Sequence, residues 1–152
     1  MHLPNDGRMT AEDLELVSGL GLVKGLLRLD NMGRWDEVDW HELAKHLRAD
    51  CTVILRLFFP GCLEPDQFVA RAAERLAVIL PVLGGSRTAP TGGREVLIEI
   101  HNEPNHRDGI EGWGKEIYHA RQFAAWYMRV LVDLRALGFG GLGWPGRAVG
   151  EW

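Results

Sequence analysis

Apolar positions along the chain fall into two kinds of pattern. In short, nearly continuous apolar runs they are typical of buried strands, at residues 22–29, 51–59 and 95–101. Elsewhere they recur every three or four positions, as on one face of an amphipathic helix, at residues 10–20, 36–47, 64–83 and 117–137. A further strand is expected at residues 138–145, where four glycines weaken the pattern.

The order of these elements alternates helix with strand and predicts an α/β fold. No hairpin signal joins neighbouring strands, so each crossover is expected to be helical and the strands parallel, in an open sheet or an arc of a barrel. The run at residues 51–59 is nearly continuous in apolar residues, which predicts a strand covered on both faces. A chain of 152 residues fits one domain spanning residues 1–152.

Composition and charge narrow the classes of partner. The formal charge of −4 argues against nucleic acid, because proteins that bind a phosphate backbone concentrate Lys and Arg. No apolar run reaches the roughly 18 residues that a bilayer requires, so no membrane span is expected. Residues 1–6 lack the basic and apolar regions of a signal peptide, and the chain as written is expected to be cytoplasmic, a truncated secreted protein being the alternative.

The two cysteines flank one predicted strand. If residues 52–59 are extended at about 3.3 Å per residue, Cys51 and Cys62 lie roughly 25 Å apart, far beyond disulfide reach. Two free thiols are therefore expected.

Polar residues cluster where the predicted strands end. They are Asp30 and Asn31, Arg56, residues 101–105 and Trp144. In parallel α/β folds the ligand site lies at this edge, where the loops after the strands converge. Glu103 precedes Pro104, whose ring restricts the backbone of both residues, so its carboxyl group is expected to point in a fixed direction.

Residues 98–105, Ile-Glu-Ile-His-Asn-Glu-Pro-Asn, resemble the end of the fourth strand in clan-A glycoside hydrolases, which are retaining (β/α)8 barrels. The resemblance implies that Glu103 is the general acid/base and that Asn102 hydrogen-bonds the sugar 2-hydroxyl. A carboxylic acid with a raised pKa suits that chemistry, because it protonates the leaving oxygen and, once ionised, activates water. The aromatic-rich helix and the glycine-rich residues 137–145 that follow are also similar to these enzymes.

The chain departs from that clan in lacking the strand that carries the nucleophile. The clan's nucleophile is a Glu after the seventh strand, whereas this chain has room for about half of a barrel, which typically needs about 250 residues. If Glu103 ends the fourth barrel strand, strands one and six to eight are absent, and Glu151 follows no apolar strand. Exposed strand edges and an open interior predict a homodimer or association with the missing half of the barrel.

Two functions are therefore expected from the resemblance. One is retaining hydrolysis of an O-glycosidic bond, with Glu103 as acid/base and a carbohydrate substrate. The alternative is a non-catalytic half-barrel that acts as a sugar-binding or assembly subunit. A third reading, an unrelated α/β protein with a chance motif, stays open because a fold alone does not establish a function.

The candidate substrate-binding residues are Asn102, His101, Asn105, Arg56, Asn31 and Trp144. Arg56 lies in an apolar strand, where its charge requires an acceptor, and in a barrel interior Glu103 is expected to supply it. A structural ion pair and a substrate contact are both open. Trp144 suits either sugar stacking or packing. Asp30 and Asn31 suit either hydroxyl binding or capping of the next turn.

No metal or cofactor is expected. His101 and His106 are separated by Pro104, which interrupts a helix that would bring them to one face, and no third ligand is evident. The Asn-Glu-Pro-Asn segment also has the composition of an ordinary turn, and its place directly after an apolar strand is what favours a functional role.

Overall fold

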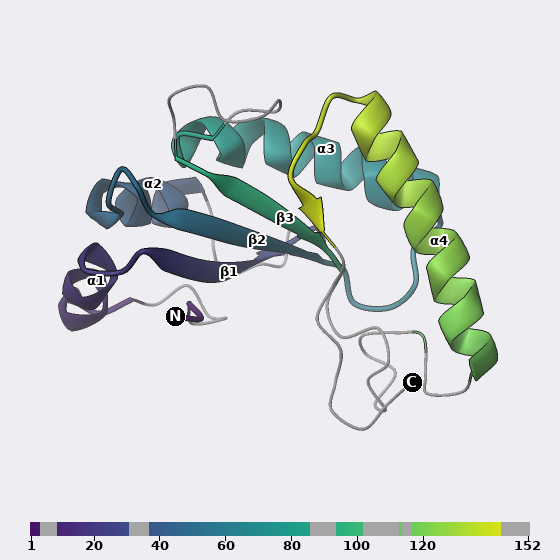
Figure 1. The fold of residues 1–152 in the computed structure, drawn as a ribbon, viewed down its shortest axis with the longest axis horizontal. Helices are drawn as coiled ribbons and strands as arrows, with labels where there is room; N and C mark the ends of the chain where they lie inside the picture. Colours follow the sequence, from purple (N-terminus) through teal and green to yellow (C-terminus); the bar gives the residue numbers. More distant parts are fainter. Residues whose placement is uncertain (4–8, 31–36, 86–93, 102–112, 114–116, 144–152) are drawn as a thin grey trace.

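A computed structural model describes residues 1–3, 9–30, 37–85, 94–101, 113 and 117–143 (Figure 1). The alternating order predicted from the sequence is confirmed. Within the described residues the elements are α1 (Ala11–Ser18), β1 (Leu22–Arg28), α2 (Glu37–His46), β2 (Thr52–Phe58), α3 (Pro65–Val82), β3 (Val96–Ile100), α4 (Ile117–Ala136) and β4 (Leu142–Gly143).

The strands form one parallel sheet in the order β1-β2-β3-β4, which confirms the predicted parallel pairing. Because neighbours in sequence are neighbours in the sheet, right-handed crossovers put the connecting helices on one face. Helix α1 contacts α2, α2 contacts α3 and α3 contacts α4. The helix layer therefore runs from α1 at one end to α4 at the other (Figure 1).

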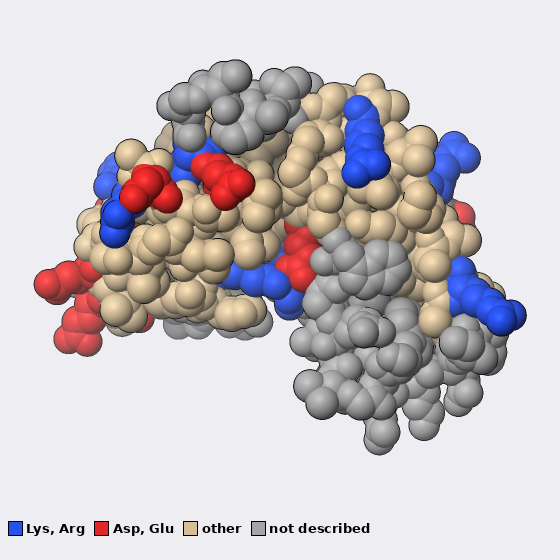
Figure 2. Space-filling model, in the orientation of Figure 1, with Lys and Arg blue, Asp and Glu red and all other residues tan. Residues whose placement is uncertain are grey.

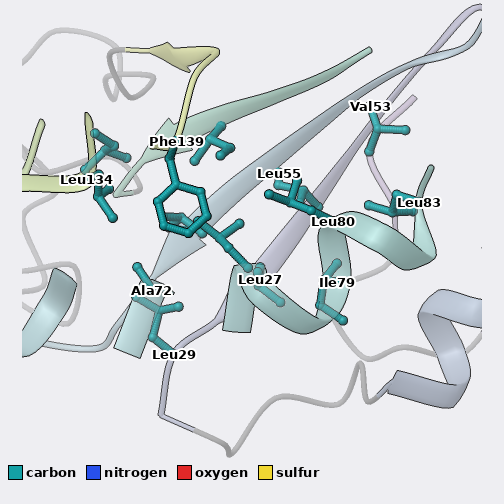
Figure 3. Packing of buried hydrophobic residues seen from close by; sticks show 14 of the residues in the cluster. Leu27, Leu29, Val53, Leu55, Ala72, Ile79, Leu80, Leu83, Leu134 and Phe139 are labelled. Atoms are coloured by element: carbon teal, nitrogen blue, oxygen red, sulfur yellow. The ribbon is translucent and has the colours of Figure 1, made fainter. Parts of the chain in front are cut away.

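Burial alternates along the strands, because one face of the sheet packs against the helices. In Figure 3, Leu27, Val53 and Leu55 lie among side chains of α3 that include Ile79 and Leu80, and all five are buried. The other face, called here the open face, is partly exposed. Its side chains come from alternate positions of the first three strands: Leu22, Lys24, Leu26, Arg28, Thr52, Ile54, Arg56, Leu97 and Glu99.

The prediction that residues 51–59 form a strand covered on both faces is wrong. Val53, Leu55 and Leu57 are fully buried against the helices, whereas Ile54 and Arg56, on the open face, keep part of their surface exposed. The apolar run continues across both faces of β2, so its composition gives no sign that only one face is covered.

A short segment that the sequence pattern did not predict pairs with the outer edge of β1. His2 forms a parallel bridge with Lys24, the Leu3 amide donates to the Lys24 carbonyl at 2.7 Å, and the Lys24 amide donates to the Met1 carbonyl at 2.8 Å. Residues 1–3 thus extend the sheet by a short bridged segment beyond β1.

Both cysteines are free thiols, as predicted. Cys51 is buried and Cys62 is exposed. Burial raises the pKa of the Cys51 thiol above the ordinary value for cysteine, and partial desolvation by neighbouring atoms raises the pKa of the exposed Cys62 thiol. Neither group therefore has the lowered pKa of a reactive thiolate.

Candidate functional site

The carboxyl ends of β1, β2 and β3 bring a charged pair and aromatic rings to one edge of the sheet. Arg28, the last residue of β1, donates to both carboxylate oxygens of Asp30, from Nε at 3.0 Å and from a terminal nitrogen at 2.5 Å. The guanidinium also lies over the Phe58 ring, 5.6 Å from its centroid. The hydrogen bonds from Arg28 to Asp30 raise the pKa of the guanidinium above its usual range.

Arg28 is a residue of this edge that the sequence analysis missed. A charged residue inside the apolar run 22–29, two positions before Asp30, was the available signal. The alternatives considered for Asp30 were hydroxyl binding and capping, and the structure adds a bidentate ion pair with Arg28.

His101 directly follows β3, has a left-handed backbone conformation with φ of 72°, and is only 1% exposed. Its ring stacks on Phe68 of α3 at 6.4 Å between centroids, and three further rings meet it edge-on at 5.6 to 6.2 Å: Phe58, Phe123 and Trp126. A non-glycine residue at positive φ persists only where its surroundings hold it, and such residues gather at functional sites. The candidate substrate-binding residue His101 is thus a buried anchor for the backbone that continues into Asn102.

The strain at His101 predicts an unusual order of variants. His101→Ala and His101→Gly both remove the aromatic contacts, but only glycine adopts the left-handed conformation without a Cβ clash. We expect His101→Gly to be about 1 kcal/mol more stable than His101→Ala, as measured by urea unfolding. An alanine variant at least as stable as the glycine variant would show that the backbone at this position is not strained.

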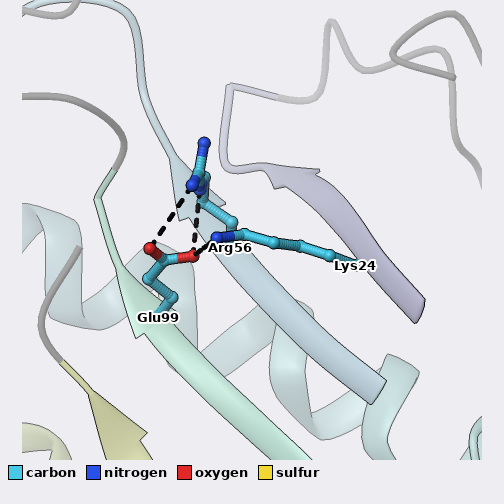
Figure 4. A network of polar contacts seen from close by, with 3 residues as sticks. All are labelled: Lys24, Arg56 and Glu99. Carbon is cyan, nitrogen blue, oxygen red and sulfur yellow. Dashed lines mark hydrogen bonds and ion pairs between the residues drawn. The ribbon is translucent and has the colours of Figure 1, made fainter. Parts of the chain in front are cut away.

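One carboxylate on the open face joins two cations from neighbouring strands (Figure 4). Glu99 of β3 forms an ion pair with Lys24 of β1 and accepts from Arg56 of β2, whose Nε lies 3.0 Å from its Oε2. All three side chains are largely buried, with 10%, 17% and 15% of their surface exposed for Glu99, Lys24 and Arg56. A structural ion pair and a substrate contact were both open for Arg56, and the structure contains the ion pair.

A cavity of about 420 Å³ adjoins this network. Its lining combines the charged Lys24 and Glu99 with apolar side chains and with the backbone of β4; the other lining residues are Ile54, Leu97, Ile98, Gly141, Leu142 and Gly143. A mostly apolar hollow with a few polar groups at one side is typical of a binding surface.

The other residues predicted for the site, Glu103, Asn102, Asn105, Asn31 and Trp144, lie outside the described residues. In the sequence, each follows closely after a strand of the parallel sheet, and the carboxyl ends of such strands share one edge.

Comparison of the chain with protein-family models, with curated proteins and with solved structures finds no match. Among the described residues, no group of three or more His, Cys, Asp or Glu side chains is arranged to hold a metal ion. None of the helices in the described part of the chain is long and apolar enough to cross a membrane.

Proposed function

We propose that this chain is the acid/base-bearing part of a retaining glycoside hydrolase of the (β/α)8-barrel type. Glu103 is the general acid/base and Asn102 the donor to the sugar 2-hydroxyl. The observation that carries the proposal is the position of residues 102–105, directly after the carboxyl end of β3 in a parallel sheet.

The strand order supports an arc of a barrel. In a (β/α)8 barrel, strands that are consecutive in sequence are adjacent in space, whereas a doubly wound sheet reverses its order at a switch point. The described sheet runs β1-β2-β3-β4 without a reversal. If residues 1–3 take the first barrel position, then β1, β2 and β3 take the second, third and fourth. In clan-A enzymes the acid/base lies after the fourth strand, which corresponds here to β3.

This assignment revises one point of the sequence analysis, which left the first barrel position empty. The parallel bridge between His2 and Lys24 supports filling that position with residues 1–3. On this reading, the strands to be supplied from elsewhere are the sixth to the eighth.

The chemistry requires a second carboxylate about 5 to 5.5 Å from Glu103, which attacks the anomeric carbon while Glu103 protonates the leaving oxygen. Ionised Glu103 then takes a proton from the water that releases the sugar. Asn105, Asn31 and Trp144 are further candidate contacts for the carbohydrate, and this reaction needs neither a metal nor a cofactor. The nucleophile is supplied by a strand outside residues 1–152.

The alternative is a non-catalytic half-barrel that binds sugar or serves as an assembly subunit. The observation that favours it is that residues 104–152 contain no apolar strand that ends in a glutamate, so a nucleophile is not found among these residues. Binding of sugar without turnover distinguishes it from the first proposal.

Aryl glycosides with good and poor leaving groups test the assignment of Glu103. An activated aryl group departs without protonation, whereas a poor one needs the acid. With formate added as an external nucleophile in place of the missing carboxylate, Glu103→Gln is therefore expected to lose turnover of the poor leaving group far more than that of the activated one, while the control Glu95→Gln changes neither. Background rates for wild type and Glu103→Gln alike, with sugar binding retained in calorimetry, would favour the non-catalytic alternative. Absence of both binding and turnover would overturn both proposals.

A further inference from the structure

The two ends of the helix layer differ in charge. Helix α1, at one end, exposes Glu12 and Glu15 and contains no Lys or Arg. Helix α4, at the other end, exposes Arg121 and Arg135, and its one acidic residue, Asp133, is paired with Arg129 at 2.7 Å. Figure 2 shows acidic side chains at the α1 end and mainly basic ones over α4.

Exposed apolar side chains gather at the same two ends. On α4, Met128 and Val132 are 53% and 54% exposed on the side that also carries Arg121 and Arg135. On α1, Leu16 is 57% exposed beside Glu12 and Glu15. The remaining exposed large apolar residues are Leu22 and Leu97 on the open face, Leu137 directly after α4, and Val78 of α3. Apolar surface flanked by charge of one sign is typical of an interaction site.

We propose that these ends bind each other in a dimer of this chain, with α4 of each copy against α1 of its partner. Contact between like ends would place Glu against Glu or Arg against Arg, and would be repulsive. Contact between unlike ends is attractive. Two copies related by a two-fold axis form this contact twice, because α4 of each copy meets α1 of the other, and the assembly is then a closed dimer. The partner is therefore a second copy, because one chain carries both halves of the complementary surface.

The open face does not oppose this association. Lys24 and Arg56 already share the carboxylate of Glu99, so their charges need no acidic group from a partner. The inference goes beyond the proposed function and does not depend on it, because it concerns the two ends of the helix layer and not the carboxyl edge of the sheet.

Charge reversal at each end tests the dimer without sugar or turnover. The acidic-end variant is Glu12→Lys with Glu15→Lys, and the basic-end variant is Arg121→Glu with Arg135→Glu. Sedimentation velocity of the wild type at micromolar concentration is expected to show a dimer. Each variant alone places like charges at both junctions and is expected to dissociate, with affinity lowered about tenfold or more.

An equimolar mixture of the two variants is expected to restore the dimer. Lysines of one variant then meet glutamates of the other at one junction, and the native pair of charges meets at the second. The chain that carries all four reversals is expected to dimerise by itself for the same reason. Glu74→Lys, an exposed charge reversal on α3 away from both ends, is the matched control and leaves the dimer unchanged.

A monomeric wild type, or a dimer that neither reversal weakens, would overturn the inference. So would reversals that weaken the dimer without recovery in the mixture, because charge complementarity between unlike ends would then not be its cause. Circular dichroism and urea unfolding show whether each variant is folded, so that a weaker dimer is not mistaken for an effect of unfolding. None of these outcomes bears on the role of Glu103, which the aryl-glycoside assay measures separately.

Discussion

Replacing Glu99 by glutamine is expected to lower the free energy of unfolding by about 3 kcal/mol, because two largely buried cations lose their shared acceptor. Lys24 and Arg56 both make their ion pairs with this one carboxylate, on the open face of the sheet. A neutral amide offers a single weaker acceptor, and the two positive charges then repel each other. Urea unfolding monitored by tryptophan fluorescence measures the effect.

The matched control is Glu95→Gln, an exposed glutamate of the same region whose carboxylate accepts from the Thr52 hydroxyl at 2.8 Å. It leaves no cation behind and is expected to cost less than about 1 kcal/mol. Equal costs for Glu99→Gln and Glu95→Gln would show that the network contributes nothing beyond a surface hydrogen bond.

A triple variant separates the cost of breaking the network from its net contribution. Lys24→Met, Arg56→Met and Glu99→Leu together replace the three charged side chains by apolar groups of similar size. Removing all members of a buried ion network is often neutral or stabilising, whereas removing one member is not. We therefore expect the triple variant to be more stable than Glu99→Gln.

The network also illustrates how far the sequence could predict the site. An Arg in an apolar strand requires an acceptor, and that requirement at Arg56 was read correctly. Glu99 was not predicted as the acceptor, because this pairing depends on the register between β2 and β3. That register places Arg56 directly opposite Glu99. Register is set by packing between distant segments and leaves little trace in local pattern.

The helices, strands and parallel order could be predicted because apolar periodicity, glycines and the absence of hairpin turns are local signals. The partial exposure of the open face could not be predicted from the sequence. Ile54 is apolar there, so the run at residues 51–59 was interpreted as a strand covered on both faces. Apolar side chains on a partly exposed face are themselves consistent with a surface that associates with another polypeptide.

The pairing of residues 1–3 and the left-handed backbone at His101 were also beyond the sequence analysis. A segment of three residues is too short for any periodicity. Positive φ at a histidine depends on the four aromatic rings around it, which come from β2, α3 and α4. The sequence thus located the residues at the strand end without showing how that end is held.

The second large effect is expected at Trp40, where Trp40→Ala should cost about 3 to 5 kcal/mol. Its indole is fully buried and extends over Gly25 of β1. Truncation removes a large apolar side chain and leaves a cavity between α2 and the sheet. The same urea titration measures the loss.

Gly25 makes this prediction specific, because the indole occupies the space that a side chain there would need. A Cβ at Gly25 would lie 2.8 Å from the Trp40 Cη2 atom and 3.1 Å from a Leu3 methyl carbon. Gly25→Ala is therefore expected to cost about 1 to 3 kcal/mol in the wild type.

In a Trp40→Phe background the same alanine meets a smaller ring, and the cost of Gly25→Ala is expected to fall by about 1 kcal/mol or more. The double-mutant cycle needs only the four unfolding free energies. If the losses in unfolding free energy from the two substitutions simply add, then glycine is needed at position 25 for its backbone conformation or to make room for Leu3, and not to make room for the indole. A positive coupling would establish that the glycine in β1 is there to seat Trp40, and with it α2, against the sheet that carries the candidate site.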